Sequence, residues 1–132
     1  MKSASKFLLY AIVLTIASYV QQASAVNLDS LEKAINSKTI TDQERISIYN
    51  DLSWGYLSED FEKSKHYAIA GIAIAEKTKN LLMTGTLYRN LGVAYYMISQ
   101  HDTALIHLRH ALDIAQKVKH NLLTAQVYGA MA

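Results

Sequence analysis

Residues 87–95 read LYRNLGVAY, and this stretch decides the fold because the chain contains more than one copy of it. Residues 48–56, IYNDLSWGY, match it 39 positions earlier, with tyrosine second and last and leucine fifth in both copies. A second segment, residues 72–79 (IAIAEKTK), recurs 40 positions later as residues 112–119 (LDIAQKVK). A third copy of the first segment begins at Val127-Tyr128. Self-similarity at a fixed period of this size indicates repeated structural units.

The apolar residues within a unit have helical spacing. One stripe consists of Leu87, Tyr88, Leu91 and Tyr95, and a second consists of Ala104, Leu105, Leu108, Ala111, Leu112 and Ala115. Both follow the i, i+3, i+4 pattern of an amphipathic helix. The polar residues 99–102 (SQHD) separate them and predict a turn. Each unit is therefore predicted to be a helix, a turn and a second helix, and the units must stack to cover their apolar faces.

Several polar clusters mark the expected ends of helices. Residues 41–44 (TDQE) form a capping box that predicts a helix start near Thr41. Residues 58–60 (SED) supply cap-type residues between two helices, and Asn80 and Asn121 are candidate starts of later ones. A short helix is expected over residues 27–37, where it could shield the first end of the stack.

These boundaries predict three regions. They are a leader (residues 1–25), a lead-in helix (26–40) and a repeat array (41–132), the last divided into residues 41–79, 80–119 and 120–132.

Residues 1–25 have the pattern of a secretory signal peptide. Lys2 and Lys6 precede an apolar run from residue 7 to residue 20, and Ala23-Ser24-Ala25 offers small residues for signal peptidase. The alternative is an uncleaved membrane anchor. The apolar run is shorter than the roughly 20 residues that a spanning helix needs. We therefore expect cleavage after Ala25 and export to the periplasm or the medium.

Composition excludes several classes of function. The chain has 13 Lys+Arg and 11 Asp+Glu, and the excess of two equals Lys2 and Lys6, so the remainder is formally neutral. A neutral chain argues against nucleic acid as the partner, because binding to phosphates requires clustered positive charge. The absence of cysteine excludes disulfides, a thiolate nucleophile and a lipid-modified N-terminal cysteine.

At these residues the chain resembles the tetratricopeptide-repeat (TPR) family. The family pattern has an aromatic residue early in the first helix, then Leu-Gly, then another aromatic, with small residues at set places in the second helix. The second unit matches at Tyr88, Leu91, Gly92, Tyr95, Ala104, Leu108 and Ala111; the first matches more loosely at Tyr49, Leu52, Ser53, Tyr56, Ser64, Ala68 and Gly71. The resemblance covers roughly residues 41–132 and implies an all-α fold, a right-handed α/α solenoid of helix hairpins. The usual closing proline is missing, and the offset of 39 or 40 positions makes these lengthened repeats, as in exported TPR regions of bacteria.

The resemblance implies a non-catalytic scaffold that binds a peptide or helix in its concave groove. By TPR geometry the groove is lined by Asn50, Trp54, Thr86, Arg89, Val93, Tyr96, Met97 and Gln126. Aromatic, amide and arginine side chains suit a peptide, since rings provide contact area and polar groups pair with backbone. For Trp54 and Tyr96 the alternative is ordinary packing against neighbouring helices. One TPR subclass clamps an acidic C-terminus, and Asn90 matches one of its clamp positions. Such a clamp is not expected here, because Trp54, Gln126 and Ala130 occupy other clamp positions and carry no positive charge.

A second interpretation makes the chain the input region of a larger signalling protein. Residues 131–132 fall inside the expected first helix of a third unit, so we expect the sequence to be a fragment. The longer protein would be a membrane-bound sensor histidine kinase or a helix-turn-helix regulator. Membrane contact is then expected only through an uncleaved leader or a later segment, and an oligomer is compatible with either interpretation.

No constellation of residues predicts catalysis, a metal or a cofactor. His107 and His110 are three residues apart on one predicted helix, but they lack enough further ligands for a metal site, so we expect both to face solvent. His101 is expected in a turn, and no histidine accompanies a nucleophile.

Overall fold

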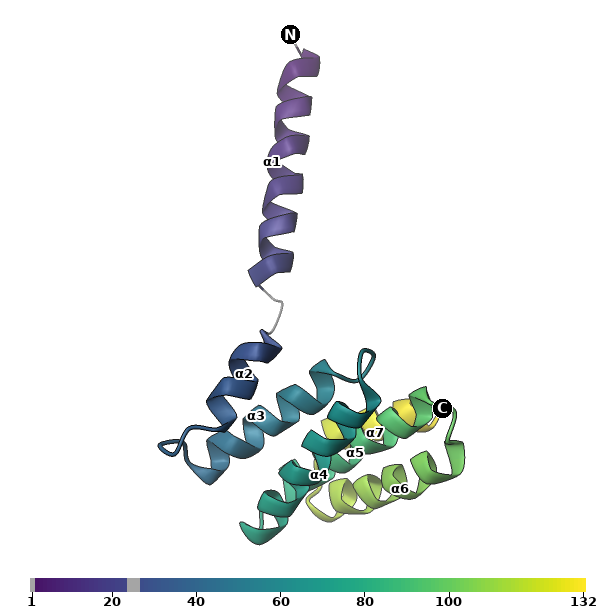
Figure 1. Ribbon diagram of the computed structural model, residues 1–132. Helices are drawn as coiled ribbons and strands as arrows, with labels where there is room; N and C mark the ends of the chain where they lie inside the picture. The colour runs from purple at the N-terminus through teal and green to yellow at the C-terminus, as the bar shows by residue number, and fades with distance from the viewer. Residues whose placement is uncertain (1, 24–26) are drawn as a thin grey trace.

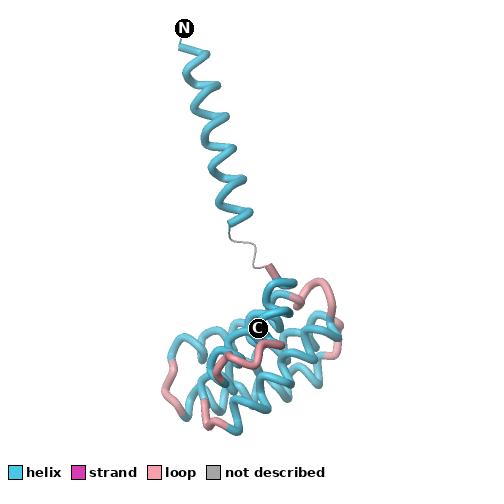
Figure 2. The backbone as a smooth tube through the Cα atoms, turned by 60° about the vertical axis from the view of Figure 1, so that its left-hand side comes forward, coloured by secondary structure: helices cyan, strands magenta, loops and turns pink. Residues whose placement is uncertain are grey.

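The computed structural model describes residues 2–23 and 27–132, and every regular element within them is an α-helix (Figure 2). The helices are α1 (Lys2–Ala23), α2 (Leu28–Ile35), α3 (Asp42–Gly55), α4 (Phe61–Lys77), α5 (Leu81–Met97), α6 (His101–Lys117) and α7 (Asn121–Met131). The prediction of an all-α fold is confirmed.

Helices α3 to α7 form consecutive hairpins that stack in the same way (Figure 1). We call α3–α4 the first unit, α5–α6 the second unit, and α7 the first helix of the third. Helix α5 packs against both α3 and α4, and α7 against both α5 and α6, whereas the backbones of α4 and α6 do not approach each other closely within the described residues. The first helices of the units therefore lie next to one another along one side of the stack, as in a solenoid.

One polar contact between units repeats along the stack. The Tyr88 hydroxyl donates to the Glu76 carboxylate at 3.3 Å, which joins α5 to α4. One repeat later, the Gln116 amide donates to the Tyr128 hydroxyl at 3.4 Å, which joins α7 to α6. The internal sequence repeat is thus also a repeat of contacts.

The two helices of a unit approach closely at small residues. A Cβ atom on Gly92 would lie 2.7 Å from Leu108 Cγ and 3.2 Å from the Ala104 carbonyl oxygen. In the first unit the buried Ser64 hydroxyl donates to the Ser53 carbonyl at 2.8 Å, at the same crossing point. Small residues therefore permit both crossings.

Side chains cap the helices at most of the expected places. Thr41 and Glu44 form the predicted capping box, and Asp60 accepts a bond from the Lys63 amide at 3.0 Å. Asn80 likewise caps α5, but α7 is capped by His120, whose Nδ1 accepts from the Leu123 amide at 3.1 Å. The expected start at Asn121 is therefore the first helical residue rather than the cap.

The ends of α4, α5 and α6 share one backbone conformation. Lys79, Ser99 and Lys119 have φ angles of 57°, 63° and 54°, although none is glycine. Each is followed by an amide that reaches back to a carbonyl near the end of the helix, for example Asn80 to Ala75 at 2.8 Å. These bonds satisfy carbonyls at the helix end. The predicted turn is correspondingly shorter than expected, because His101 begins α6 and does not lie in the turn.

Helix α2 covers the end of the stack that is formed by the first unit. A Cβ atom on Gly55 would lie 2.4 Å from Leu28 Cδ2, so the glycine allows α2 to lie against the end of α3. The Arg45 guanidinium donates to the Ile35 carbonyl and, at 3.1 Å, to the Ser37 carbonyl. These bonds fix the C-terminal end of α2, which ends at Ile35 rather than at the expected Ser37.

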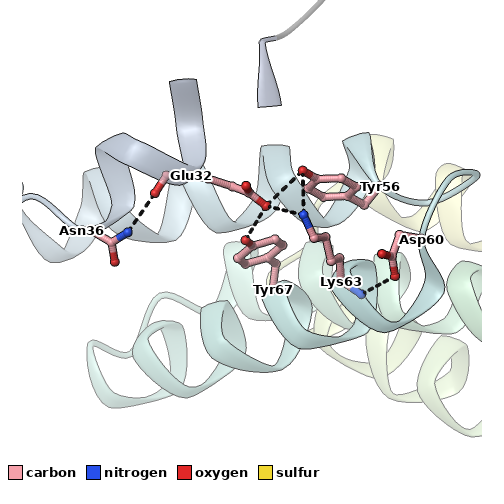
Figure 3. Close-up of polar contacts among 6 residues, drawn as sticks. All are labelled: Glu32, Asn36, Tyr56, Asp60, Lys63 and Tyr67. Carbon is pink, nitrogen blue, oxygen red and sulfur yellow. Dashed lines mark hydrogen bonds and ion pairs between the residues drawn. The ribbon is translucent and has the colours of Figure 1, made fainter. Parts of the chain in front are cut away.

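A cluster of polar groups joins the middle of α2 to both helices of the first unit (Figure 3). Glu32 Oε1 accepts from the hydroxyls of Tyr67 and Tyr56, at 2.7 and 3.0 Å, and from Lys63 Nζ at 3.0 Å. The hydrogen bond from Tyr67, followed by those from Lys63 and Tyr56, lowers the pKa of Glu32. Burial and the neighbouring carboxylate raise the pKa of Tyr67 to about 12.

Helix α2 packs against the first unit in the way that α4 packs against the second unit. Tyr95 of the second unit packs edge-on against Phe61 of α4, with ring centroids 5.3 Å apart. The equivalent residue of the first unit, Tyr56, instead contacts Glu32 of α2. One short helix thus covers a face that a full second helix covers elsewhere.

Replacing Glu32 with glutamine should release α2 without unfolding the array. The lowered pKa means that ionised Glu32 favours the folded state above its ordinary pKa, and that this contribution is lost as the pH falls through the lowered value. We therefore expect faster hydrogen exchange in α2 for Glu32→Gln at neutral pH, with α3–α6 unchanged. Asp29→Asn removes the same charge from the same helix without touching the cluster. Equal exchange in the two variants would show that the cluster does not hold α2.

Helix α1 makes no contact with any other described helix (Figure 1). Its side chains from Phe7 to Leu14 are largely exposed, including Phe7, Leu8, Leu9 and Tyr10. A search of the described helices for a membrane-crossing span finds none. The expected cleavage site after Ala25 lies outside the described residues.

Candidate functional site

A groove of about 680 Å³ runs across the first helices of the three units. Its lining comes from α3 (Asn50, Asp51, Trp54 and Gly55), α5 (Arg89 and Val93) and α7 (Gln126 and Ala130). The groove exists because the first helices lie next to one another, so that one stripe from each faces the same space.

Arg89 occupies the centre of this groove. Its Nη1 donates to Gln126 Oε1 on α7, and its Nη2 donates to Asn90 Oδ1 at 2.9 Å. Its guanidinium carbon lies 4.9 Å from the centroid of the Trp54 ring, within the range of a cation–π contact. Partial burial lowers the pKa of Arg89, yet an arginine remains charged at any physiological pH.

Buried Asn90 connects this arginine to α3. Its Nδ2 donates to Asn50 Oδ1 at 3.0 Å, while its Oδ1 accepts from Arg89. A polar chain therefore crosses the groove floor from α3 through α5 to α7. Because buried Asn90 bonds to both Asn50 and Arg89, these three polar side chains are positioned before any ligand arrives.

Trp54 provides the largest apolar surface of the groove. Its side chain is 50% exposed although Arg89 lies against its ring. Val93 and Ala130, which are partly buried, extend the apolar lining onto α5 and α7. An exposed ring beside amide and guanidinium groups is suited to a polypeptide that offers both apolar side chains and backbone polar groups.

A family model described as tetratricopeptide repeat matches residues 56–117. The chain is a TPR protein. The match begins at Tyr56, directly after α3, and ends at the last residue of α6, so it covers α4 and the whole hairpin of the second unit and leaves out α3 and α7. Searches of curated proteins and of solved structures each gave no match. TPR domains generally act as protein–protein interaction modules and as non-catalytic scaffolds.

The TPR array brings five of the eight expected groove residues together. Asn50, Trp54, Arg89, Val93 and Gln126 all line the groove. Thr86, Tyr96 and Met97 do not belong to its lining.

Each of these three residues has other surroundings. The Thr86 hydroxyl donates to the Leu82 carbonyl of its own helix at 2.9 Å. Tyr96 is exposed and packs edge-on against His101, with ring centroids 5.0 Å apart. Met97 is the last residue of α5, whereas α3 ends at Gly55, which corresponds to Ala94, so α3 provides no helical wall opposite Met97.

Three lining residues of the TPR groove were not among the eight expected ones, namely Asp51, Gly55 and Ala130, although the sequence places Ala130 at a clamp position. The repeat itself contained a signal for two of them. Asp51 stands one repeat before Asn90 and Ala130 one repeat after it, so they hold the same position in successive first helices.

Two of the histidines of α6, His107 and His110, lie beside the tyrosines of the TPR hairpin. His107 stacks on Tyr95 at 5.3 Å between centroids, and His110 lies 4.3 Å from the Tyr88 ring centroid. The prediction that both face solvent is wrong for His107, which is partly buried, and burial followed by the nearby His110 lowers its pKa. No group of three or more potential metal ligands is found within the described residues.

Proposed function

We propose that this TPR array is a protein-interaction module outside the cytoplasm, and that it binds a peptide or helix from another protein in the groove defined above. The observation that carries the proposal is the arrangement of Arg89 and Trp54. A half-exposed indole and a held guanidinium form the centre of a concave surface that spans three units. Tryptophan and arginine are the side chains most enriched among the energetically dominant residues of protein interfaces.

Replacing Trp54 with alanine should weaken binding strongly and leave the fold intact. A dominant interface residue contributes about 2 kcal/mol or more, so affinity for the partner that co-purifies with the chain should fall by about 30-fold or more. Affinity is measured by titration calorimetry, and far-UV circular dichroism should remain helical.

Ile69→Ala is the matched control for Trp54→Ala. Ile69 lies on α4 outside the groove and is 51% exposed, almost the same as Trp54. If the two substitutions reduce affinity equally, the groove is not the binding surface. If Trp54→Ala loses its helical spectrum, Trp54 is a structural residue.

We also propose that residues 1–25 direct export and are then removed. The lack of contact between α1 and the array supports this, because removal of α1 would uncover no part of the array. Expression of the chain in a bacterium should yield an extracytoplasmic protein whose N-terminal residue is Val26, as measured by mass spectrometry. Ala25→Leu should block processing, since signal peptidase requires a small residue before the cut. An intact N-terminus in the wild-type protein would contradict the proposal.

A further inference from the structure

We propose that the ligand of the groove carries an aspartate or glutamate side chain that binds Arg89, next to an apolar side chain that packs on Trp54. This inference rests on the proposed function, since it specifies which polypeptide the groove accepts.

The hydrogen bonding of Arg89 is incomplete. A guanidinium has five N–H donors. Two of them have acceptors within the described residues, Gln126 Oε1 and Asn90 Oδ1, and Nε is a buried donor without one. A buried donor that lacks an acceptor is unfavourable. Nη1 and Nη2 each keep one further N–H, to which the two oxygens of a ligand carboxylate could bind.

The positive charge of the Arg89 guanidinium is not compensated by a negative one. Both acceptors are neutral amides, and no carboxylate of the described residues lies within ion-pair distance of Arg89. Withdrawal from water makes this charge more costly, which is also why the pKa of Arg89 is lowered. An anionic ligand group would offset this cost, and charge-assisted bonds from arginine to carboxylate are among the strong ones.

The hydrogen bond to Gln126 is not sufficient to give Arg89 a purely structural role. It is an exposed side chain on α7, so it can move away when a stronger acceptor enters. Elsewhere in the chain, Arg45 has a structural role and binds two backbone carbonyls outside the groove. Arg89 instead points into a groove and lies against a half-exposed ring.

The remaining lining limits the ligand to one acidic contact. Among the described residues, Arg89 is the only cationic one that lines this groove, and Asp51 places a negative charge on the α3 side. A cluster of several acids would be repelled there. One acidic side chain on the α5 side, followed by an apolar side chain toward Trp54, matches both the charge and the apolar surface.

The experiment starts from a random dodecapeptide library displayed on phage and selected on the purified full chain. The strongest binder is synthesised together with a version in which its acidic residue is changed to the amide. Both peptides are titrated against the wild type, Trp54→Ala, Arg89→Gln and Asp51→Asn. Arg89→Gln retains an amide that can bond to its neighbours. The comparison of the acidic peptide with its amide version on the wild-type protein does not depend on the folding of any variant.

We expect the selected peptides to share an acidic residue adjacent to an apolar one. Changing the acid to the amide should weaken binding to the wild type by about 10- to 100-fold, as for hydrogen bonds to charged groups. On Arg89→Gln the same change should cost about 2-fold or less, because the two effects are coupled. Asp51→Asn should leave affinity equal or raise it, since a like charge is removed.

The failures of the two proposals are distinguishable. Two results would overturn the inference and leave the proposed function standing. In the first, the peptides bind through Trp54 but share no acidic residue. In the second, changing the acid to the amide weakens binding to the wild type and to Arg89→Gln by the same factor. Weaker binding to Asp51→Asn would also overturn it. If no selected peptide depends on Trp54, the proposed function fails, and the inference fails with it.

Discussion

Replacing Leu87 with alanine is expected to lower the free energy of unfolding by about 2–5 kcal/mol. Leu87 lies on α5 with 0% exposure and belongs to a cluster with Ile46, Ala68 and Ile72 of the first unit. Its side chain also fills the space beside Gly71 of α4. Removing it leaves a cavity where two units meet, and a stack of this size has little stability to spare.

Urea unfolding followed by circular dichroism measures this loss. Leu122→Ala makes the same chemical change at a side chain that is 64% exposed on α7. It should change stability by about 0.5 kcal/mol or less. Similar losses in the two variants would mean that the contact between the units is not what stabilises the stack.

Replacing Gly92 with alanine is expected to destabilise the protein by about 1–3 kcal/mol, despite alanine's better helix propensity. The added Cβ would meet Leu108 at 2.7 and 2.8 Å, and the Ala104 carbonyl oxygen at 3.2 Å. The leucine can shift, but the carbonyl belongs to the backbone of α6. The two helices of the second unit must therefore separate or the leucine must leave its position.

Gly129→Ala is the control, because a Cβ on this helical glycine would have no neighbour within 4 Å. It should stabilise α7 by up to about 1 kcal/mol, as alanine does in a helix. The two substitutions thus have opposite expected signs, which thermal unfolding can resolve. Stabilisation by both would contradict the close crossing of α5 and α6.

The repeat made most of the fold predictable from sequence. Two copies of an amphipathic pair determine the period, and the small residues Ser53 and Gly92 mark where helices cross. The cluster around Glu32 was not predictable, because it joins residues 24–35 positions apart that share no periodic pattern. The left-handed backbone conformation of Lys79, Ser99 and Lys119 was also not predictable, since this conformation usually indicates glycine.

The candidate groove was predictable only where the first helices run in register. Asn50, Trp54 and Arg89 lie within the length that α3 and α5 share, and they line it together. Met97 lies beyond the end of α3, and the apolar pattern alone does not tell how far that helix extends. The hydrogen bonds that hold Arg89 could likewise not be predicted from the sequence, since they depend on how α5 and α7 are placed relative to each other.

The most direct test of the account is site-specific photo-crosslinking of the complete protein in its native cell. A benzophenone amino acid is introduced at Val93, inside the groove, or at Ile106, which is 66% exposed on α6 outside it. Groove binding predicts that illumination joins a discrete polypeptide to the chain at position 93 and not at position 106, and that Trp54→Ala abolishes the product. The same product at both positions, or at position 106 alone, would contradict it.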